Sequence, residues 1–203
     1  MPIIVPAARI ERWLANFAER HGPTSRTVTD GALTGVAEDG SDFVAHLPFD
    51  QSYDGPPDDV GAFVAAVEGS VPDDWGVLLV RKGGFAVARL SGTTTGESKV
   101  GQRHVQGRTK AGGQSQQRFA RRRDNQARQA YEAAAEHAAR ILGQRHPVVT
   151  GGDRSAVEEV LADPRLTGLT VVEPWLDVPD PKRGILEQAV RDACSARIDV
   201  RNA

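Results

Sequence analysis

The chain has 203 residues and a formal net charge of -2, which suits one large soluble domain or two small ones with a buried core. Its single cysteine, Cys194, excludes an internal disulfide framework and fits a reducing compartment. No apolar run approaches the ~20 residues that span a bilayer, and the first residues lack the basic flank of a signal peptide, so we expect a cytoplasmic protein with no membrane partner.

The N-terminal third predicts two helices that flank short strands. Apolar residues recur at helical spacing after Ala7, and Gly22-Pro23 ends that stretch. Asp39-Gly40 marks a turn between two strands, and Asp58 or Asp59 is placed to cap a second helix. The expected elements are a helix at 7–20, strands at 26–29 and 43–47, and a helix from residue 60 that ends before Pro72.

A hairpin and one long helix dominate the middle of the chain. Two apolar runs flank Gly83-Gly84 and predict buried strands joined by a turn, and an alternating run then predicts a third strand. The following segment, 106–114, is rich in glycine and polar residues, so we expect it to be mobile. The expected elements are strands at 75–80, 85–90 and 97–105 and a helix at 115–142, stopped by Gly143.

Strands and helices alternate in the last quarter. The expected elements are strands at 147–150 and 169–172, a helix opened by a Ser155/Glu158 capping box, and a last helix at 181–196. This order predicts an α/β fold, a mixed sheet with flanking helices and an RNase H-like topology. We interpret residues 1–203 as a single domain with a loop and long helix at 106–143. The acidic N-terminal third, 1–72, is either part of the same sheet or a subdomain.

Charge is distributed unevenly along the chain. Between Arg26 and Arg81 there is no lysine or arginine, and the acidic residues there include Glu38, Asp39, Asp42, Asp50, Asp54, Asp58, Asp59, Glu68, Asp73 and Asp74. The sign then inverts, with only Asp124 opposing Lys99, Arg103, Arg108, Lys110, Arg118, Arg121, Arg122, Arg123 and Arg128. This asymmetry predicts a basic face for a polyanion, against the alternative of a merely solvated helix face.

One tract carries the strongest functional signal. Gly112-Gly113-Gln114 leads into a helical stretch with the pattern Arg-Phe-x-Arg-x-Arg at 118–123. Two glycines let the backbone approach a ligand closely, and the arginines offer a surface for phosphates. The tract resembles the catalytic-domain signature of eukaryotic and archaeal peptide-chain release factors. Because the chain has no room for their other domains, it most resembles the Vms-like release-factor family.

The resemblance implies a release-factor catalytic domain that hydrolyses peptidyl-tRNA without reading a codon, on stalled large ribosomal subunits. Gly112, Gly113 and Gln114 would be its catalytic residues, and the partners would be the large subunit, peptidyl-tRNA and ribosomal RNA. No cofactor or metal is implied, and nothing requires more than a monomer. RNA-binding residues are expected to be Arg108, Lys110, Arg118, Arg121, Arg122 and Arg123. One departure is Ala111, where release factors often carry a basic residue.

The chemistry also follows from the residues. A Gly112-Gly113 backbone enters a crevice that a side chain would block. The N–H of Gln114 can donate to a developing oxyanion while its side-chain amide orients water. Glutamine is no general base at neutral pH, so the proton moves through RNA hydroxyls or solvent.

Two alternatives stay open. An RNase H-like fold also suits a nuclease that cuts tRNA or other RNA, although such enzymes usually hold metal with clustered carboxylates. A non-catalytic ribosome-binding adaptor would use the basic helix alone. In that case Arg121 and Arg122 would matter for binding and Gln114 would not.

Overall fold

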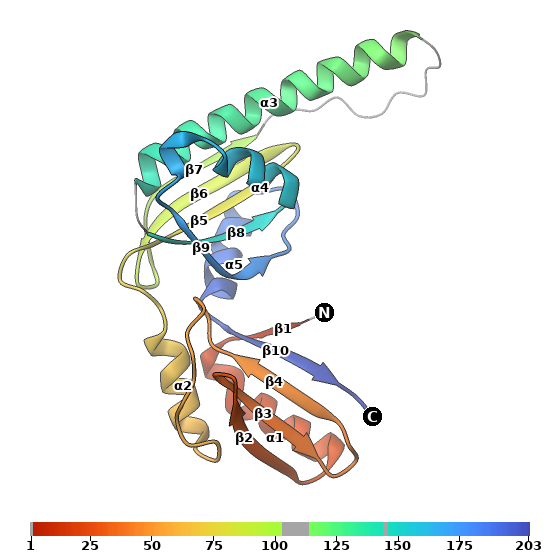
Figure 1. Ribbon diagram of the computed structural model, residues 1–203, viewed down its shortest axis with the longest axis vertical. Coiled ribbons are helices and arrows are strands. Elements are labelled where there is room, and N and C mark those ends of the chain that lie inside the picture. Colours follow the sequence, from red (N-terminus) through yellow and green to blue (C-terminus); the bar gives the residue numbers. More distant parts are fainter. Residues whose placement is uncertain (1, 103–113, 144–145) are drawn as a thin grey trace. The chain divides into compact units, whose positions relative to one another are not determined.

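The computed structural model describes residues 2–102, 114–143 and 146–203, with the backbone alone at 114–127. The chain splits into two compact units. The terminal unit comprises 1–72 and 190–203, and the central unit comprises 73–189 (Figure 1). The acidic N-terminal third therefore does not join the central sheet, and the C-terminal residues complete the unit to which it belongs.

The terminal unit is built on an antiparallel sheet with the strand order β1-β10-β4-β3-β2. Its strands are β1 (Ile3–Val5), β2 (Thr24–Thr29), β3 (Ala32–Ala37), β4 (Asp42–His46) and β10 (Ala196–Arg201). Its helices are a 3-10 turn η1 (Ala7–Arg9), α1 (Ile10–His21) and α2 (Val60–Gly69).

The two helices of the terminal unit form as their sequence predicts. α1 buries Ile10, Leu14 and Phe17 on one face, the stripe expected of an amphipathic helix. α2 begins where the Asp59 side chain accepts a hydrogen bond from the N–H of Ala62, so Asp59 and not Asp58 is the N-cap. The predicted start of the first helix at residue 7 is replaced by the 3-10 turn.

Three strands of the terminal sheet were not expected from the sequence: β1, β3 and β10. β3 follows β2 through Asp30 and Gly31, whose φ angles of 52° and 73° are the positive values of a type I′ hairpin. The Asp30-Gly31 pair is therefore a signal in the sequence for the hairpin of β2 and β3. Asp39-Gly40 does lie at a turn, but it connects β3 to β4.

The central unit contains a mixed sheet with the order β7-β6-β5-β8-β9. Its strands are β5 (Trp75–Arg81), β6 (Gly84–Ser91), β7 (Thr94–Gln102), β8 (Pro147–Gly152) and β9 (Thr170–Leu176). Its helices are α3 (Gln114–Leu142), α4 (Arg154–Leu161), the 3-10 turn η2 (Pro164–Leu166) and the first part of α5 (Arg183–Ala193). The unit boundary falls within α5.

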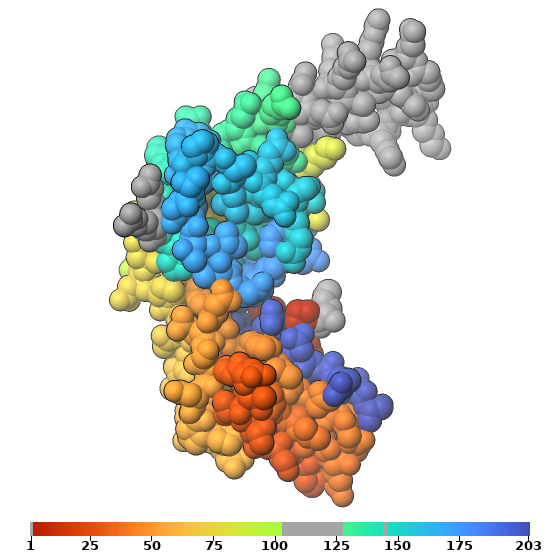
Figure 2. All heavy atoms as spheres, in the orientation of Figure 1, coloured from red at the N-terminus to blue at the C-terminus, as the bar shows by residue number. Residues whose placement is uncertain are grey.

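This strand order confirms the predicted α/β fold and its RNase H-like topology. β5, β6 and β7 form an antiparallel meander, and β8 and β9 then add parallel to β5. β5 is buried from Trp75 to Val80, as expected of a central strand. α3 and α4 pack together against the sheet through Ala138, Leu142 and Val157. Figure 2 shows the last turns of α3, in green, over this unit.

Two local expectations were wrong. Ser155 and Glu158 form no capping box, because the N-cap of α4 is Asp153 and Ser155 lies inside the helix. The last helix ends at Ala193 and not at Ala196, since Ala196 already pairs with Val5 of β1. Among the residues that the structure describes, no helix is both long and apolar enough to cross a membrane.

Candidate functional site

The predicted site lies at the start of α3, the longest helix of the described chain. Its 29 residues extend over about 43 Å at 1.5 Å per residue. The C-terminal part buries Ala130, Ala134, Ala138, Ile141 and Leu142. Gln114 precedes Ala130 by about 24 Å along the axis. Figure 1 shows this N-terminal part of α3 extending past the sheet.

Aromatic stacking holds the C-terminal part of α3 on the central sheet. The imidazole of His137 stacks on the Phe85 ring of β6, with centroids 5.6 Å apart and an interplanar angle of 28°. The Phe85 ring in turn lies directly over Gly101 of β7, where a Cβ atom would collide with it. Gly101 therefore lets the ring lie flat near the end of β7, one residue before Gln102 closes the strand.

Two further contacts hold the C-terminal end of α3. Leu142 lies over Gly76 of β5, a position where any side chain would meet it. Arg140 forms an ion pair with Glu97 of β7. Because β7 leads into the segment that precedes α3, these contacts fix both the strand before the Gly-Gly-Gln tract and the helix after it.

The predicted catalytic residues fall at or beyond the edge of what the structure describes. Gln114 is the first residue of α3, and its side chain lies outside the description. Gly112 and Gly113 lie outside the described residues, as do Arg108 and Lys110. Their predicted roles stay predictions.

Four of the predicted RNA-binding residues belong to the first half of α3. Arg118, Arg121, Arg122 and Arg123 follow Gln114 by about 6 to 14 Å along the helix axis. The first turn of α3 contains no acidic residue, so the positive end of the helix dipole is not neutralised from within the helix. The helix start thus combines a positive dipole end with four closely following cations.

The acidic stretch before the hairpin is partly neutralised by cations from elsewhere in the chain. Asp42 pairs with Arg201, which lies 159 residues later. Asp74 accepts two hydrogen bonds of 2.8 Å from Arg89 and lies 3.1 Å from His146 Nδ1. The Arg89 hydrogen bond, helped by His146, lowers the pKa of the Asp74 carboxyl. Asp42 and Asp74 are therefore partly neutralised by side chains that are distant in the sequence, which a count of charges along the chain does not reveal.

The described part of the chain contains no group of three or more His, Cys, Asp or Glu side chains arranged to hold a metal ion.

The central unit identifies this chain as a release-factor-like, ribosome-associated protein, because a release-factor family model matches it. The family model described as "Actinobacteria/chloroflexi VLRF1 release factor" matches residues 73–199. The chain belongs to this family. The match begins at the first residue of the central unit and continues through α5 into β10.

Two solved structures are also similar to this chain. One is described as "Vms1 mitochondrial localization core", with 11% identity, a TM-score of 0.40, and coverage of 97% of this chain and 82% of that chain. The other is Pelota from Archaeoglobus fulgidus, with 13% identity, a TM-score of 0.32, and coverage of 92% of this chain and 60% of that chain. No curated protein sequence matches the chain.

Proposed function

We propose that this protein is a peptidyl-tRNA hydrolase that releases nascent chains from stalled large ribosomal subunits without reading a codon. The observation that carries the proposal is that α3 begins at Gln114, which directly follows Gly112 and Gly113 in the sequence, in a chain of the VLRF1 release-factor family. The proposed partners are the large subunit, peptidyl-tRNA and ribosomal RNA. We further propose that the protein acts in the cytoplasm as a monomer.

The N-terminus of α3, the tip of the helix at Gln114, has a geometry that suits catalysis. The first N–H groups of an α-helix have no acceptor within the helix, so those near Gln114 are available to an external oxygen. The positive end of the helix dipole adds to their effect on a developing oxyanion. Two glycines before the helix keep that tip narrow enough to enter an RNA crevice.

The proposed reaction is ester hydrolysis. Water held by the Gln114 amide attacks the carbonyl carbon of the peptidyl ester, and the bond from that carbon to the tRNA ribose oxygen breaks. The ribose oxygen receives a proton through RNA hydroxyls or solvent, which leaves a free tRNA and a peptide with a carboxyl terminus. Gln114 positions the water and polarises the ester carbonyl, and it does not itself take the proton, because an amide is too weak a base near neutral pH.

The first half of α3, called the arm below, is proposed to extend Gln114 into the ribosomal cavity and to bind RNA there. Among the described side chains of α3, the first buried one is that of Ala130, about 24 Å from Gln114. We propose that the turns before it enter a cavity while the sheet stays outside. The four arginines at 118 and 121–123 are proposed to contact RNA phosphates along that path.

The decisive experiment measures peptide release from isolated large subunits that carry peptidyl-tRNA. Wild type should release the peptide and leave full-length tRNA, and Gln114→Ala should be slower by about 10² to 10³. Gln117→Ala, a change of the same type one turn into α3, is the matched control and should release normally.

Subunit binding and tRNA length are measured in the same samples. Equal release by wild type and Gln114→Ala would contradict the proposal. Binding without release would favour the adaptor, and shortened tRNA would favour the nuclease.

A further inference from the structure

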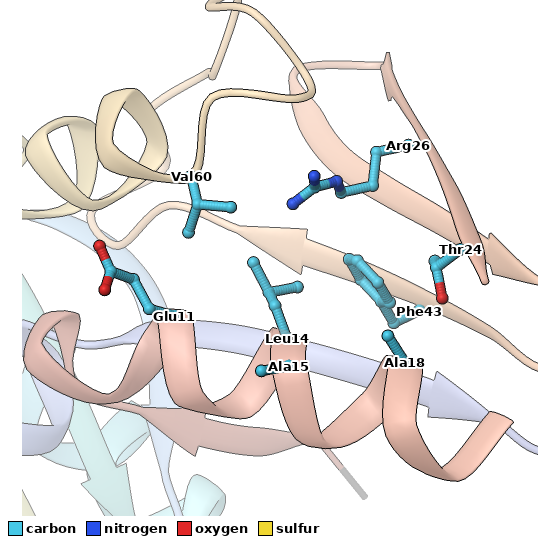
Figure 3. A pocket seen from close by; sticks show the side chains of 8 residues that line it. All are labelled: Glu11, Leu14, Ala15, Ala18, Thr24, Arg26, Phe43 and Val60. Atoms are coloured by element: carbon cyan, nitrogen blue, oxygen red, sulfur yellow. The ribbon is translucent and has the colours of Figure 1, made fainter. Parts of the chain in front are cut away.

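The terminal unit contains a pocket of about 380 Å³ between α1, strands β2 and β4, and the start of α2 (Figure 3). This volume lies within the range of pockets in which proteins bind small ligands, roughly 300 to 1,000 Å³. Every lining residue belongs to the terminal unit, so the pocket is formed without the central unit and apart from Gln114.

The floor of the pocket is apolar. It is formed by Leu14, Ala15 and Ala18 of α1, the Phe43 ring of β4, and Val60 at the first position of α2. The Phe43 ring lies over Gly35 of the neighbouring strand. The two alanines leave the space that longer side chains on this face of α1 would fill. An aliphatic side chain of a ligand would therefore be removed from water on this floor.

A guanidinium group forms one wall. In Figure 3 the Arg26 side chain reaches from β2 toward the space above Leu14 and Phe43. Its side chain is 22% exposed, and its partner in the described chain is Asp58. Arg26 Nη2 lies 3.5 Å from the Asp58 carbonyl oxygen and Arg26 Nε lies 3.7 Å from its carboxylate.

Those contacts leave most of the binding capacity of Arg26 unused. Charge-assisted hydrogen bonds are usually about 2.7 to 2.9 Å long, and a guanidinium carries five N–H donors in a fork that fits a carboxylate. The Asp58 side chain is 84% exposed, so its attraction for Arg26 is weakened by solvent. An incoming carboxylate can therefore replace Asp58.

An acidic group marks the other end of the pocket. Glu11 lies in the first turn of α1, and Figure 3 shows its carboxylate beside Val60, away from Thr24. Along the helix, residues 11 and 18 are separated by about 10 Å. A ligand that fills the pocket thus meets an anion at one end, an apolar floor in the middle and a cation at the wall.

From this arrangement, and independently of the function proposed for Gln114, we propose that the pocket binds the carboxyl-terminal end of a peptide. The terminal α-carboxylate pairs with Arg26, one or two aliphatic side chains rest on the floor, and a lysine or arginine two residues before the end pairs with Glu11. Three extended residues span about 10 Å, similar to the axial separation of Glu11 and Ala18 along the floor of the pocket. RNA is a poor fit because Glu11 repels phosphate and the floor is apolar.

The test uses the full chain and a fluorescein-labelled peptide, Gly-Lys-Leu-Leu, with either a free carboxyl terminus or a terminal amide, which removes that charge. Fluorescence anisotropy should show binding of the free acid and at least about tenfold weaker binding of the amide. Replacing the peptide lysine by glutamate should also weaken binding. No binding of the free acid, or equal binding of acid and amide, would overturn the proposal.

Matched variants assign the binding to the pocket. Arg26→Gln should weaken binding of the free acid about tenfold but leave the weak binding of the amide unchanged. Asp58→Asn, which removes the competing carboxylate, should leave binding equal or tighter. Ala15→Leu should fill the floor and abolish binding, while circular dichroism reports an unchanged fold. Unchanged affinity in both Arg26→Gln and Ala15→Leu would place the peptide elsewhere.

Discussion

His137 on α3 stacks on Phe85 of β6 with ring centroids 5.6 Å apart, and this pair joins the long helix to the second strand of the central sheet. Nδ1 of His137 is buried without a hydrogen-bond partner in the described chain, so the imidazole contributes here through its ring. This contact matters for Gln114, which lies about 24 Å along α3 from Ala130. Gln114 keeps a fixed position only if the C-terminal part of α3 is held rigidly on the sheet.

Phe85→Ala should therefore destabilise the central unit. The side chain is 5% exposed, and truncation of a buried phenylalanine typically lowers the free energy of unfolding by about 3 to 5 kcal/mol. Urea denaturation followed by circular dichroism measures the change. Glu136→Ala, a change at a solvent-exposed α3 position next to His137, is the control and should shift the midpoint little. Equal midpoints for wild type and Phe85→Ala would show that the ring does not anchor α3.

A kink in the first half of α3 should reduce peptide release without unfolding the central unit. Asn125 lies within α3 between Gln114 and the buried stripe, and proline in a helix interior removes a hydrogen bond and kinks the helix. Asn125→Pro should reduce peptide release at least tenfold, since the tip is redirected, while the urea midpoint of the anchored sheet changes little. Asn125→Ala, which favours the helix, should release as wild type does. Normal release by Asn125→Pro would argue against a rigid arm.

Binding of the basic arm to ribosomes should depend on salt. If Arg121 and Arg122 each contact a phosphate, Arg121→Gln/Arg122→Gln should weaken binding and reduce the slope of log affinity against log salt by about 1 per lost contact. Sedimentation with large subunits over a series of salt concentrations measures both quantities. The exposed Arg20 of α1 gives the matched control, Arg20→Gln, which should leave the slope unchanged. A double variant with the wild-type slope would exclude these phosphate contacts.

The one cysteine should be slow to react in the folded protein. Burial raises the pKa of the Cys194 thiol to about 11, so little thiolate exists at pH 8. Iodoacetamide should label Cys194 slowly in native buffer and rapidly in urea, as mass spectrometry can follow. Fast native labelling at pH 8 would contradict the raised pKa.

The same pKa shift also gives a pH dependence of stability. Because the folded-state pKa lies above the unfolded value, the contribution to the free energy of unfolding is complete below about pH 9 and is lost as the pH rises toward about 11. Cys194→Ala should lack this alkaline loss when its urea midpoints are compared with those of wild type.

The elements that depend on neighbouring residues could be read from the sequence. The end of α3 at Gly143, a helix cap at Asp58 or Asp59 and the hairpin of β5 and β6 all depend on residues within a few positions of each other, where periodicity and turn chemistry act directly. The Gly-Gly-Gln tract is likewise a local signal, and the family match agrees with the class of protein it indicated. The catalytic role of Gln114 itself stays a prediction.

Only the tertiary structure decided which distant segments meet. β10 pairs with β1 and β4, so the two ends of the chain share one sheet, and Arg201 reaches Asp42 across that pairing. The pocket of the terminal unit likewise joins α1, β2, β4 and the start of α2. No local pattern specifies these partners, because a short strand such as β10 can pair with any compatible edge. The choice is made when all the apolar faces are buried together.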